Sequence, residues 1–226
     1  MNYSLIIPIY NEEKTLKTLI EQLKYFSQFV EVIIINDGSC DQTETILKKQ
    51  KRFKVLHNTT NKGKGYSILK GVKNASNENI ILMDGDLEVH LDCINQLIEK
   101  YESSGYHVIN GNRWNNKLKT KKNLNNYGNN FFNQIFNLLY DTQLKDILCC
   151  AKVLNKQLFH SLKLNSRGFS IEVEIMSKLA LSGVKISEIN VPYKRRSNAQ
   201  GKKLKISDGW EILFKMIKIR FAGNKN

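Results

Sequence analysis

Acidic side chains follow directly after one apolar run of the sequence. Residues 79–83 read Asn-Ile-Ile-Leu-Met, and Asp84, Asp86 and Glu88 come next, with Gly85 between the first two. Carboxylate oxygens are the ligands that Mg²⁺ and Mn²⁺ prefer in proteins, and a glycine lets the backbone turn so that a ligand can approach. These residues therefore predict a divalent-cation site with Asp84, Asp86 and Glu88 as its ligands. The alternative is a solvated Asp-Gly turn that ends a strand.

The stretches around this cluster alternate between strand and helix patterns. Apolar runs predict buried strands at 4–10, 31–35, 54–57 and 79–82, and apolar side chains at helical spacing follow each of them. Such alternation is typical of a largely parallel sheet with right-handed crossovers. Open sheets of this kind bind ligands at the carboxyl ends of their strands. We therefore expect the polar residues that follow these strands to share one edge of the sheet.

The second half of the chain departs from this simple alternation. A fifth strand is predicted at 106–110, and a polar stretch rich in Lys and Asn, 115–126, predicts a mobile loop. The remaining expected elements, in order, are an aromatic helix at 131–140, a return strand at 141–153, a helix at 168–181, a strand at 184–191, a basic loop at 194–205 and a last helix from Asp208.

Composition narrows the classes of function. The chain has 226 residues, of which 41% are hydrophobic, as expected for one folded globular domain. It has 35 Lys and Arg against 21 Asp and Glu, and the net charge of +14 indicates an anionic partner: nucleic acid, anionic lipid or a phosphorylated substrate. A nucleic-acid-binding module is disfavoured, because no recognition helix or RNA-binding signature is present and acids follow several strands.

The cysteines and the apolar runs indicate the cellular location of the protein. The four cysteines show no Cys-x-x-Cys spacing, which favours a reducing cytosol. No segment approaches the roughly 20 consecutive apolar residues that a membrane span needs. We therefore expect a cytoplasmic protein whose membrane contact, if present, is peripheral and on the inner face.

Motifs in both halves of the chain resemble those of the family 2 glycosyltransferases. The first half contains, in order, Ile7-Pro8-Ile9-Tyr10-Asn11-Glu12-Glu13, Asn36-Asp37-Gly38-Ser39, Lys62-Gly63-Lys64-Gly65 and Met83-Asp84-Gly85-Asp86. The second half is similar to the dolichyl- and polyprenyl-phosphate sugar transferases in Gly111-Asn112-Arg113, Asp146-Ile147 with Cys150 and Lys152, Gly168-Phe169 with Glu172 and Glu174, Val191-Pro192-Tyr193, Gly201-Lys202-Lys203 and Asp208-Gly209. The resemblance implies the GT-A fold, a Rossmann-like three-layer α/β/α sandwich with a mostly parallel central sheet.

The resemblance covers nearly the whole chain and implies a single domain, 1–226. Within it, 1–110 would form the nucleotide-sugar-binding half, 111–205 the acceptor half with mobile loops, and 206–226 a C-terminal amphipathic helix. The sequence also departs from the family pattern. Asn36 replaces a usual acid, Glu88 stands where Gln is frequent, and the chain ends without the membrane helices of many relatives.

The resemblance also implies roles on the donor side. A nucleotide-diphosphosugar releases a charged diphosphate, and Mg²⁺ or Mn²⁺ held by Asp84 and Asp86 would stabilise that leaving group. The implied donor-binding residues are Pro8, Tyr10, Glu12 and Asp37 at the base and ribose, Lys62 and Lys64 at the diphosphate or base edge, Asp84, and Arg196 and Lys202 over the diphosphate. For any single lysine, the alternative is an ordinary solvent-facing charge.

On the acceptor side, cations matter more than a base. A lipid phosphate is already an anion at neutral pH, so it must be held against the like charge of the donor. Arg113 can hold it bidentately, and Lys121 and Asn125 stand near the positions where the resemblance places a basic residue and a hydroxyl. Asp86, Arg113 and Asp146 are the expected catalytic residues.

Two helices predict a membrane-facing surface. The helix at 131–140 is rich in Phe, and the helix from Asp208 combines Trp, Phe and Lys, a composition that suits a lipid interface. The alternative is that each apolar stripe packs on the core, as in any surface helix of a globular domain. Under the first reading, both helices dock on the cytoplasmic leaflet.

The leading hypothesis is a metal-dependent inverting glycosyltransferase that moves a hexose from a nucleotide-diphosphate sugar to polyprenyl phosphate. The alternative is the same donor chemistry on a soluble glycan or protein hydroxyl, which would need a base among Asp146, Glu172 and Glu174. If none is a base, one positions the acceptor, with Asp146 favoured, or all are caps and salt-bridge partners. The nucleotide, the sugar and the oligomeric state are not predicted.

Overall fold

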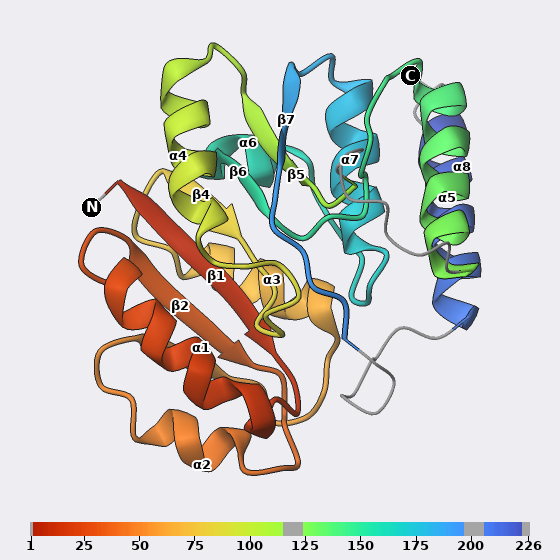
Figure 1. The fold of residues 1–226 in the computed structure, drawn as a ribbon. Coiled ribbons are helices and arrows are strands. Elements are labelled where there is room, and N and C mark those ends of the chain that lie inside the picture. The colour runs from red at the N-terminus through yellow and green to blue at the C-terminus, as the bar shows by residue number, and fades with distance from the viewer. Residues whose placement is uncertain (1, 115–123, 197–205, 223–226) are drawn as a thin grey trace.

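The computed structural model describes residues 2–114, 124–196 and 206–222, without the side chains of 124–127, 206 and 207 (Figure 1). Within these residues, a seven-stranded sheet has the order β3-β2-β1-β4-β6-β5-β7. The strands are β1 (Tyr3–Ile9), β2 (Glu31–Asn36), β3 (Lys54–His57), β4 (Asn79–Leu82), β5 (Val108–Asn112), β6 (Lys152–Asn155) and β7 (Ile186–Asn190). The helices are α1 (Glu13–Phe26), α2 (Thr43–Lys48), α3 (Lys64–Lys73), α4 (Cys93–Ser103), α5 (Leu124–Tyr140), α6 (Lys156–Ser161), α7 (Ile171–Leu181) and α8 (Ile206–Ala222).

Most neighbouring strands are parallel. β1 pairs in parallel with β2 and β4, β2 with β3, and β5 with β7. β6 is antiparallel to both of its neighbours, β4 and β5. All strands except β6 therefore point the same way, and their carboxyl ends meet at one edge of the sheet.

The sheet is buried between two helical layers, because successive side chains of a strand point to opposite faces. Leu5, Ile7 and Ile9 of β1 join a core cluster with residues of α1 and α4, whereas Ile6 joins a second cluster with residues of α3, α5, α7 and α8. Figure 1 shows α1 and α4 on the near side of β1 and α3 behind it. The predicted three-layer α/β/α sandwich is confirmed.

The predicted return strand at 141–153 is wrong in its extent. β6 covers Lys152–Asn155, and the preceding residues form turns although Ile147 and Cys149 are fully buried. Their apolar side chains gave the segment the composition of a strand, but they pack against the sheet from a loop. The short helix α6, which was not predicted, begins after Asn155, whose side chain accepts hydrogen bonds from Gln157 N and Leu158 N.

The N-terminal turn of α3 is fixed by close contact with the loop before α7. Gly63 has φ of +97°, a conformation that favours glycine, and Tyr66 N donates to Arg167 O at 3.1 Å. A Cβ on Gly65 would clash with the backbone oxygen of Ser166. The two glycines of the Lys62–Gly65 motif are thus required for helix–loop packing.

Two glycine substitutions in helices should have opposite effects on stability. Gly65→Ala should lower the free energy of unfolding by about 1–3 kcal/mol, because its methyl group must displace the 166–167 backbone. Gly128→Ala should raise it by up to about 1 kcal/mol, because Gly128 lies inside α5 with open space at its Cβ position. Urea unfolding of both variants measures this difference. Equal shifts of one sign would contradict the packing at α3.

Candidate active site

Side chains from both halves of the chain converge at the carboxyl edge of the sheet. Glu12 follows β1, Asp37 follows β2, Asp84 follows β4, Arg113 follows β5 and Arg196 follows β7. The first and last of these touch, since Arg196 Nη2 lies 2.8 Å from Glu12 Oε2. The shared edge that the sequence predicted therefore holds both acidic and basic side chains.

The acidic loop after β4 concentrates negative charge in a half-buried place. Burial raises the pKa of Asp86 to about 7, and the neighbouring charge of Asp84 adds to this rise. Asp86 Oδ1 accepts a hydrogen bond from Glu88 N at 3.0 Å, which shapes the turn. Gly85 is required inside it, because a Cβ there would lie 2.8 Å from Ile9 Cγ1. A bound cation would therefore reduce the electrostatic repulsion between the Asp84 and Asp86 carboxylates.

Lys64 neutralises the first of these carboxylates. Its ammonium lies 2.7 Å from Asp84 Oδ1 and 2.9 Å from Glu172 Oε1. Glu172 in turn pairs at 2.7 Å with Lys152, whose side chain is fully buried. Burial alone would raise the pKa of Glu172, but the charges of Lys152 and Lys64 outweigh it and lower that pKa to about 2. Four alternating charges therefore connect the acidic loop through α7 to β6.

Asp37 organises the basic turn before α3. Its buried carboxylate accepts hydrogen bonds from Asn58 Nδ2 at 2.7 Å, Lys62 N at 2.9 Å and Gly63 N at 2.8 Å. These contacts fold the turn against the end of β2 and deliver Lys64 to the acidic loop. Contact of Asp37 with a ribose, and of Lys62 with a diphosphate, stay predictions.

Arg196 and Glu12 form a bidentate ion pair. Arg196 donates to the two carboxylate oxygens of Glu12 at 3.1 and 2.8 Å and to Thr15 Oγ1 at 3.0 Å. The Arg196 N–H also donates to Glu88 Oε1 at 3.0 Å, and Tyr193 Oη donates to Glu88 Oε2 at 3.1 Å. Glu88 thus anchors the segment after β7, and its predicted role as a metal ligand stays a prediction.

Arg113 is held rigidly by Asp146. Its Nε and Nη2 donate to the two carboxylate oxygens at 2.7 and 2.8 Å, and its backbone N–H donates to Oδ2 at 3.0 Å. The rings of Trp114 and Tyr193 also lie near the guanidinium, whose Cζ is 5.5 and 5.4 Å from the two ring centroids. Burial lowers the pKa of Arg113, but the Asp146 carboxylate more than compensates, so this cation is permanent.

The other predicted residues lie at or beyond the margin of this cluster. Pro8 and Tyr10 are half-buried at the end of β1. Lys121 and Lys202 lie outside the described residues, and Asn125 belongs to the first turn of α5, where side chains are not described. Glu174 is placed elsewhere, because it accepts from Asn165 N and Ser166 N and pairs with Lys178.

The sequence profile of the family described as Glycosyl transferase family 2 matches residues 4–163. The chain belongs to this family. The predicted enzyme class, a glycosyltransferase, is confirmed with it.

Curated relatives include sugar transferases named for dolichyl phosphate, dolichol phosphate and bactoprenol. A dolichyl-phosphate beta-glucosyltransferase from Trichomonas vaginalis is 27% identical over 96% of this chain and 72% of its own length. A dolichol-phosphate mannosyltransferase from Pyrococcus furiosus is 29% identical over 94% of this chain and 62% of its own. A bactoprenol glucosyl transferase from Shigella phage SfV is 32% identical over 48% of this chain and 38% of its own. The chain thus spans only part of the length of each relative.

A solved structure confirms the fold. Glucosyl-3-phosphoglycerate synthase from Mycobacterium tuberculosis, crystallised with Mn²⁺, UDP and glucosyl-3-phosphoglycerate, superposes with a TM-score of 0.76. The match covers 97% of this chain and 80% of the synthase chain at 14% identity. At this identity the likeness shows the GT-A fold, as the motifs implied.

The contacts of three residues in this site were not predicted, although Lys152 stood in a family motif. Lys152 supports Glu172, Thr15 shares Arg196 with Glu12, and Tyr193 joins Glu88 to Arg113. Lys152 carried a readable signal, because a lone lysine in an apolar strand is buried only with a partner. Tyr193 stood in a family motif, but no sequence pattern indicated its contacts.

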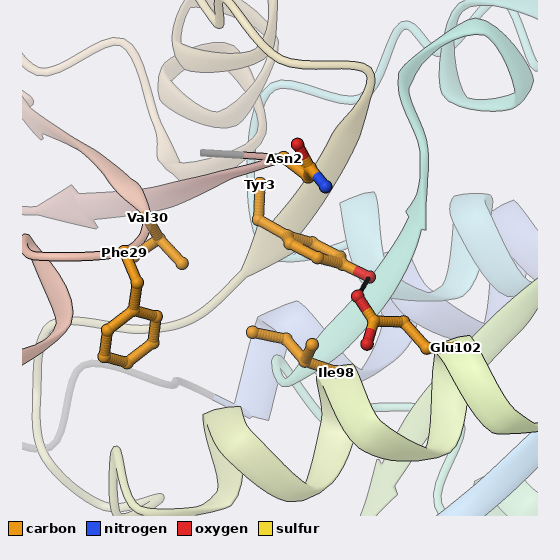
Figure 2. Close-up of a pocket in the computed structure, with 6 residues that line it drawn as sticks. All are labelled: Asn2, Tyr3, Phe29, Val30, Ile98 and Glu102. Carbon is orange, nitrogen blue, oxygen red and sulfur yellow. Dashed lines mark hydrogen bonds between the residues drawn. The ribbon is translucent and has the colours of Figure 1, made fainter.

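A hollow of about 290 Å³ lies at the opposite edge of the sheet (Figure 2). It is lined by Asn2, Tyr3, Phe29, Val30, Ile98 and Glu102. Tyr3 Oη donates to Glu102 Oε1 at 3.0 Å, and the apolar side chains shown beside it contribute no chemistry. Because this hollow lies at the amino end of β1, it is separate from the site.

Proposed function

We propose that this family 2 glycosyltransferase moves a hexose from a nucleotide-diphosphate sugar to a polyprenyl phosphate. The observation that carries the proposal is the Arg113 cation, which is fixed by Asp146 and connected through Tyr193 to Glu88 of the acidic loop. An anionic acceptor needs such a cation, whereas a hydroxyl acceptor needs a base. Relatives named for dolichyl phosphate, dolichol phosphate and bactoprenol support the same acceptor class.

The carboxylates available as bases argue against a hydroxyl acceptor. Asp146 is bound by Arg113, Glu172 by Lys64 and Lys152, and Glu174 by Lys178 and two backbone N–H groups. A carboxylate neutralised by a close cation is a weak base. The role that we propose for Asp146 is therefore to orient Arg113, which in turn holds the acceptor phosphate.

The donor side fits a divalent cation. Asp84 and Asp86 lie close enough for burial and mutual charge to raise the pKa of Asp86 to about 7, a cost that a bound dication would remove. Among the described residues, no three Asp, Glu, His or Cys side chains are grouped to hold a metal ion. Mg²⁺ commonly uses one or two carboxylates together with substrate phosphates. We infer that Asp84 and Asp86 would hold Mg²⁺ or Mn²⁺, which stabilises the departing diphosphate.

The remaining residues would orient the two substrates. Lys64 lies beside Asp84. Its ammonium would contact the donor diphosphate and would keep its ion pair with Glu172. Arg113 would place the acceptor phosphate so that its oxygen attacks the anomeric carbon as the bond to the nucleoside diphosphate breaks. Direct displacement inverts that carbon, so an α-linked donor gives a β-linked product.

The two helices α5 and α8 support contact with an anionic membrane. They pack together, with Tyr140 Oη donating to Met216 O at 2.7 Å, and Figure 1 shows them side by side at one end of the molecule. Both expose large apolar side chains, including Leu138 at 85%, Trp210 at 61% and Phe214 at 67%. No helix in the described part of the chain could cross a membrane. We propose that this exposed face rests on the leaflet that carries the acceptor.

A screen of nucleotide sugars tests the proposed function. The purified protein is incubated with each donor, Mn²⁺ or Mg²⁺, and either a short polyprenyl phosphate or the matching polyprenol. Transfer should occur to the phosphate and not to the alcohol, and EDTA should abolish it. Transfer to a soluble glycan at the same rate, with none to the lipid phosphate, would contradict the proposed acceptor.

Vesicle binding tests the proposed membrane face. Trp210→Ser with Phe214→Ser should reduce sedimentation with anionic vesicles at least about tenfold, since each buried aromatic side chain contributes about 1.5–3 kcal/mol. Tyr25→Ser with Phe29→Ser is the matched control, because both are exposed on and after α1. If the two double variants bind vesicles equally weakly, or if both bind as well as the wild type, this face is not the membrane-binding surface.

A further inference from the structure

Tyr193 lies where the donor and acceptor sides of the site meet. The chain after β7, residues 192–196, runs along the acidic loop and is bonded to it through the backbone. Val89 and Tyr193 form an isolated antiparallel bridge, His90 N donates to Pro192 O at 3.0 Å, and Lys194 N donates to Glu88 O at 2.7 Å. These bonds fix the backbone of Tyr193, so the direction of its side chain is set by the fold.

The side chain of Tyr193 makes one contact toward each half of the site. Its hydroxyl donates to Glu88 Oε2 at 3.1 Å, two residues beyond Asp86. Its ring lies against the Arg113 guanidinium, 5.4 Å from centroid to Cζ, and 5.9 Å from the ring of Trp114. Asp146 fixes Arg113 through its N–H groups, whereas the two rings limit motion out of the guanidinium plane.

The hydroxyl of Tyr193 is suited to a structural contact and not to proton transfer. Burial and the charge of Glu88 raise the pKa of Tyr193 above its usual range, so the hydroxyl remains protonated at neutral pH. A protonated phenol is a fixed donor to a carboxylate. The ring, in contrast, acts on Arg113 whether or not the hydroxyl is present. The two contacts can therefore be separated by substitution.

We propose that Tyr193 is a positioning residue that sets Arg113, the proposed acceptor-phosphate cation, relative to the acidic loop of the donor side. The inference rests on the proposed function and names a residue through which its two subsites are coupled. A displacement transfer requires the attacking oxygen and the anomeric carbon to be in line at close range. A single rigid side chain that contacts both subsites holds that geometry.

Two substitutions of Tyr193 test the two contacts. Tyr193→Phe keeps the ring and should leave the dissociation constant for short polyprenyl phosphate within about twofold of wild type, measured in EDTA without donor. Tyr193→Leu removes the flat ring and should weaken that binding about tenfold, the size expected for loss of one cation–π contact. In turnover, Tyr193→Phe should raise the donor KM because it loses the contact with Glu88, and Tyr193→Leu should raise both the donor and the acceptor KM.

Tyr101 offers the matched control. Its hydroxyl also donates to a side chain, Asn79 Oδ1 at 3.4 Å, and its ring packs on Tyr3 away from the site. Tyr101→Phe and Tyr101→Leu should lower thermal stability as much as the Tyr193 variants do, but leave both KM values unchanged. A Tyr193→Leu variant with wild-type affinity for the lipid phosphate would overturn the role of Tyr193.

The experiment also separates this inference from the proposed function. If the wild-type protein binds no polyprenyl phosphate, the proposed acceptor is wrong and the positioning role of Tyr193 falls with it. If the wild type binds and transfers to the phosphate but Tyr193→Leu does the same, the proposed function stands and the role of Tyr193 alone is wrong. Equal KM changes in the Tyr101 and Tyr193 variants would likewise show that Tyr193 contributes only to packing.

Discussion

The structure depends on the balance of charges at the carboxyl edge of the sheet. Parallel strands deliver Glu12, Asp84 and Asp86 to the same edge, where like charges repel and burial makes each ionised group costly. Cations from distant parts of the chain offset this cost. Arg196 is 184 residues from its partner Glu12, and Lys64 is 20 residues from Asp84. The Arg196–Glu12 and Lys64–Glu172 pairs join segments that lie far apart in the sequence, and they therefore help to assemble the site.

The arrangement of these pairs fits the exchange of partners that the proposed reaction requires. Lys64 has two carboxylate partners, so Glu172 would still hold it if Asp84 bound the proposed cation. Glu172 is itself supported by the buried Lys152, which keeps it ionised. A buried pair that loses one member is strongly destabilised, by about 3–5 kcal/mol, whereas a chain of alternating charges can lose one contact and keep the others. This chain of ion pairs therefore suits a site that binds and releases charged ligands.

Much of the first half of the sheet could be predicted from the sequence because it is built from local patterns. An apolar run followed by acids and glycine predicts both a buried strand and its polar end, and β1 to β4 follow one another along the chain. The second half was harder to predict. Ile147 and Cys149 are buried as in a strand, yet they belong to a loop, because apolar content reports burial and not backbone shape. Only the pairing of β6 with β4 and β5 sets where that strand begins.

The partners of the site residues could not be predicted, even where the residues themselves were. Arg113 and Asp146 were both expected in the site, but their bidentate pairing depends on loops 33 residues apart. Glu88 was expected to bind a metal, and its contact with Tyr193 lies across 105 residues. Motifs suggested which residues belong to the site, whereas the tertiary fold decides which side chains pair with one another.

The central claim is that Asp84 and Asp86 hold a divalent cation that stabilises the departing nucleoside diphosphate. The most direct measurement is the rate of sugar transfer by Asp84→Asn with Asp86→Asn, with unfolding followed in parallel to confirm the fold. The account predicts a loss of about a hundredfold or more, as for removal of a main electrostatic contact to the leaving group. Transfer at the full wild-type rate by the folded double variant would contradict it.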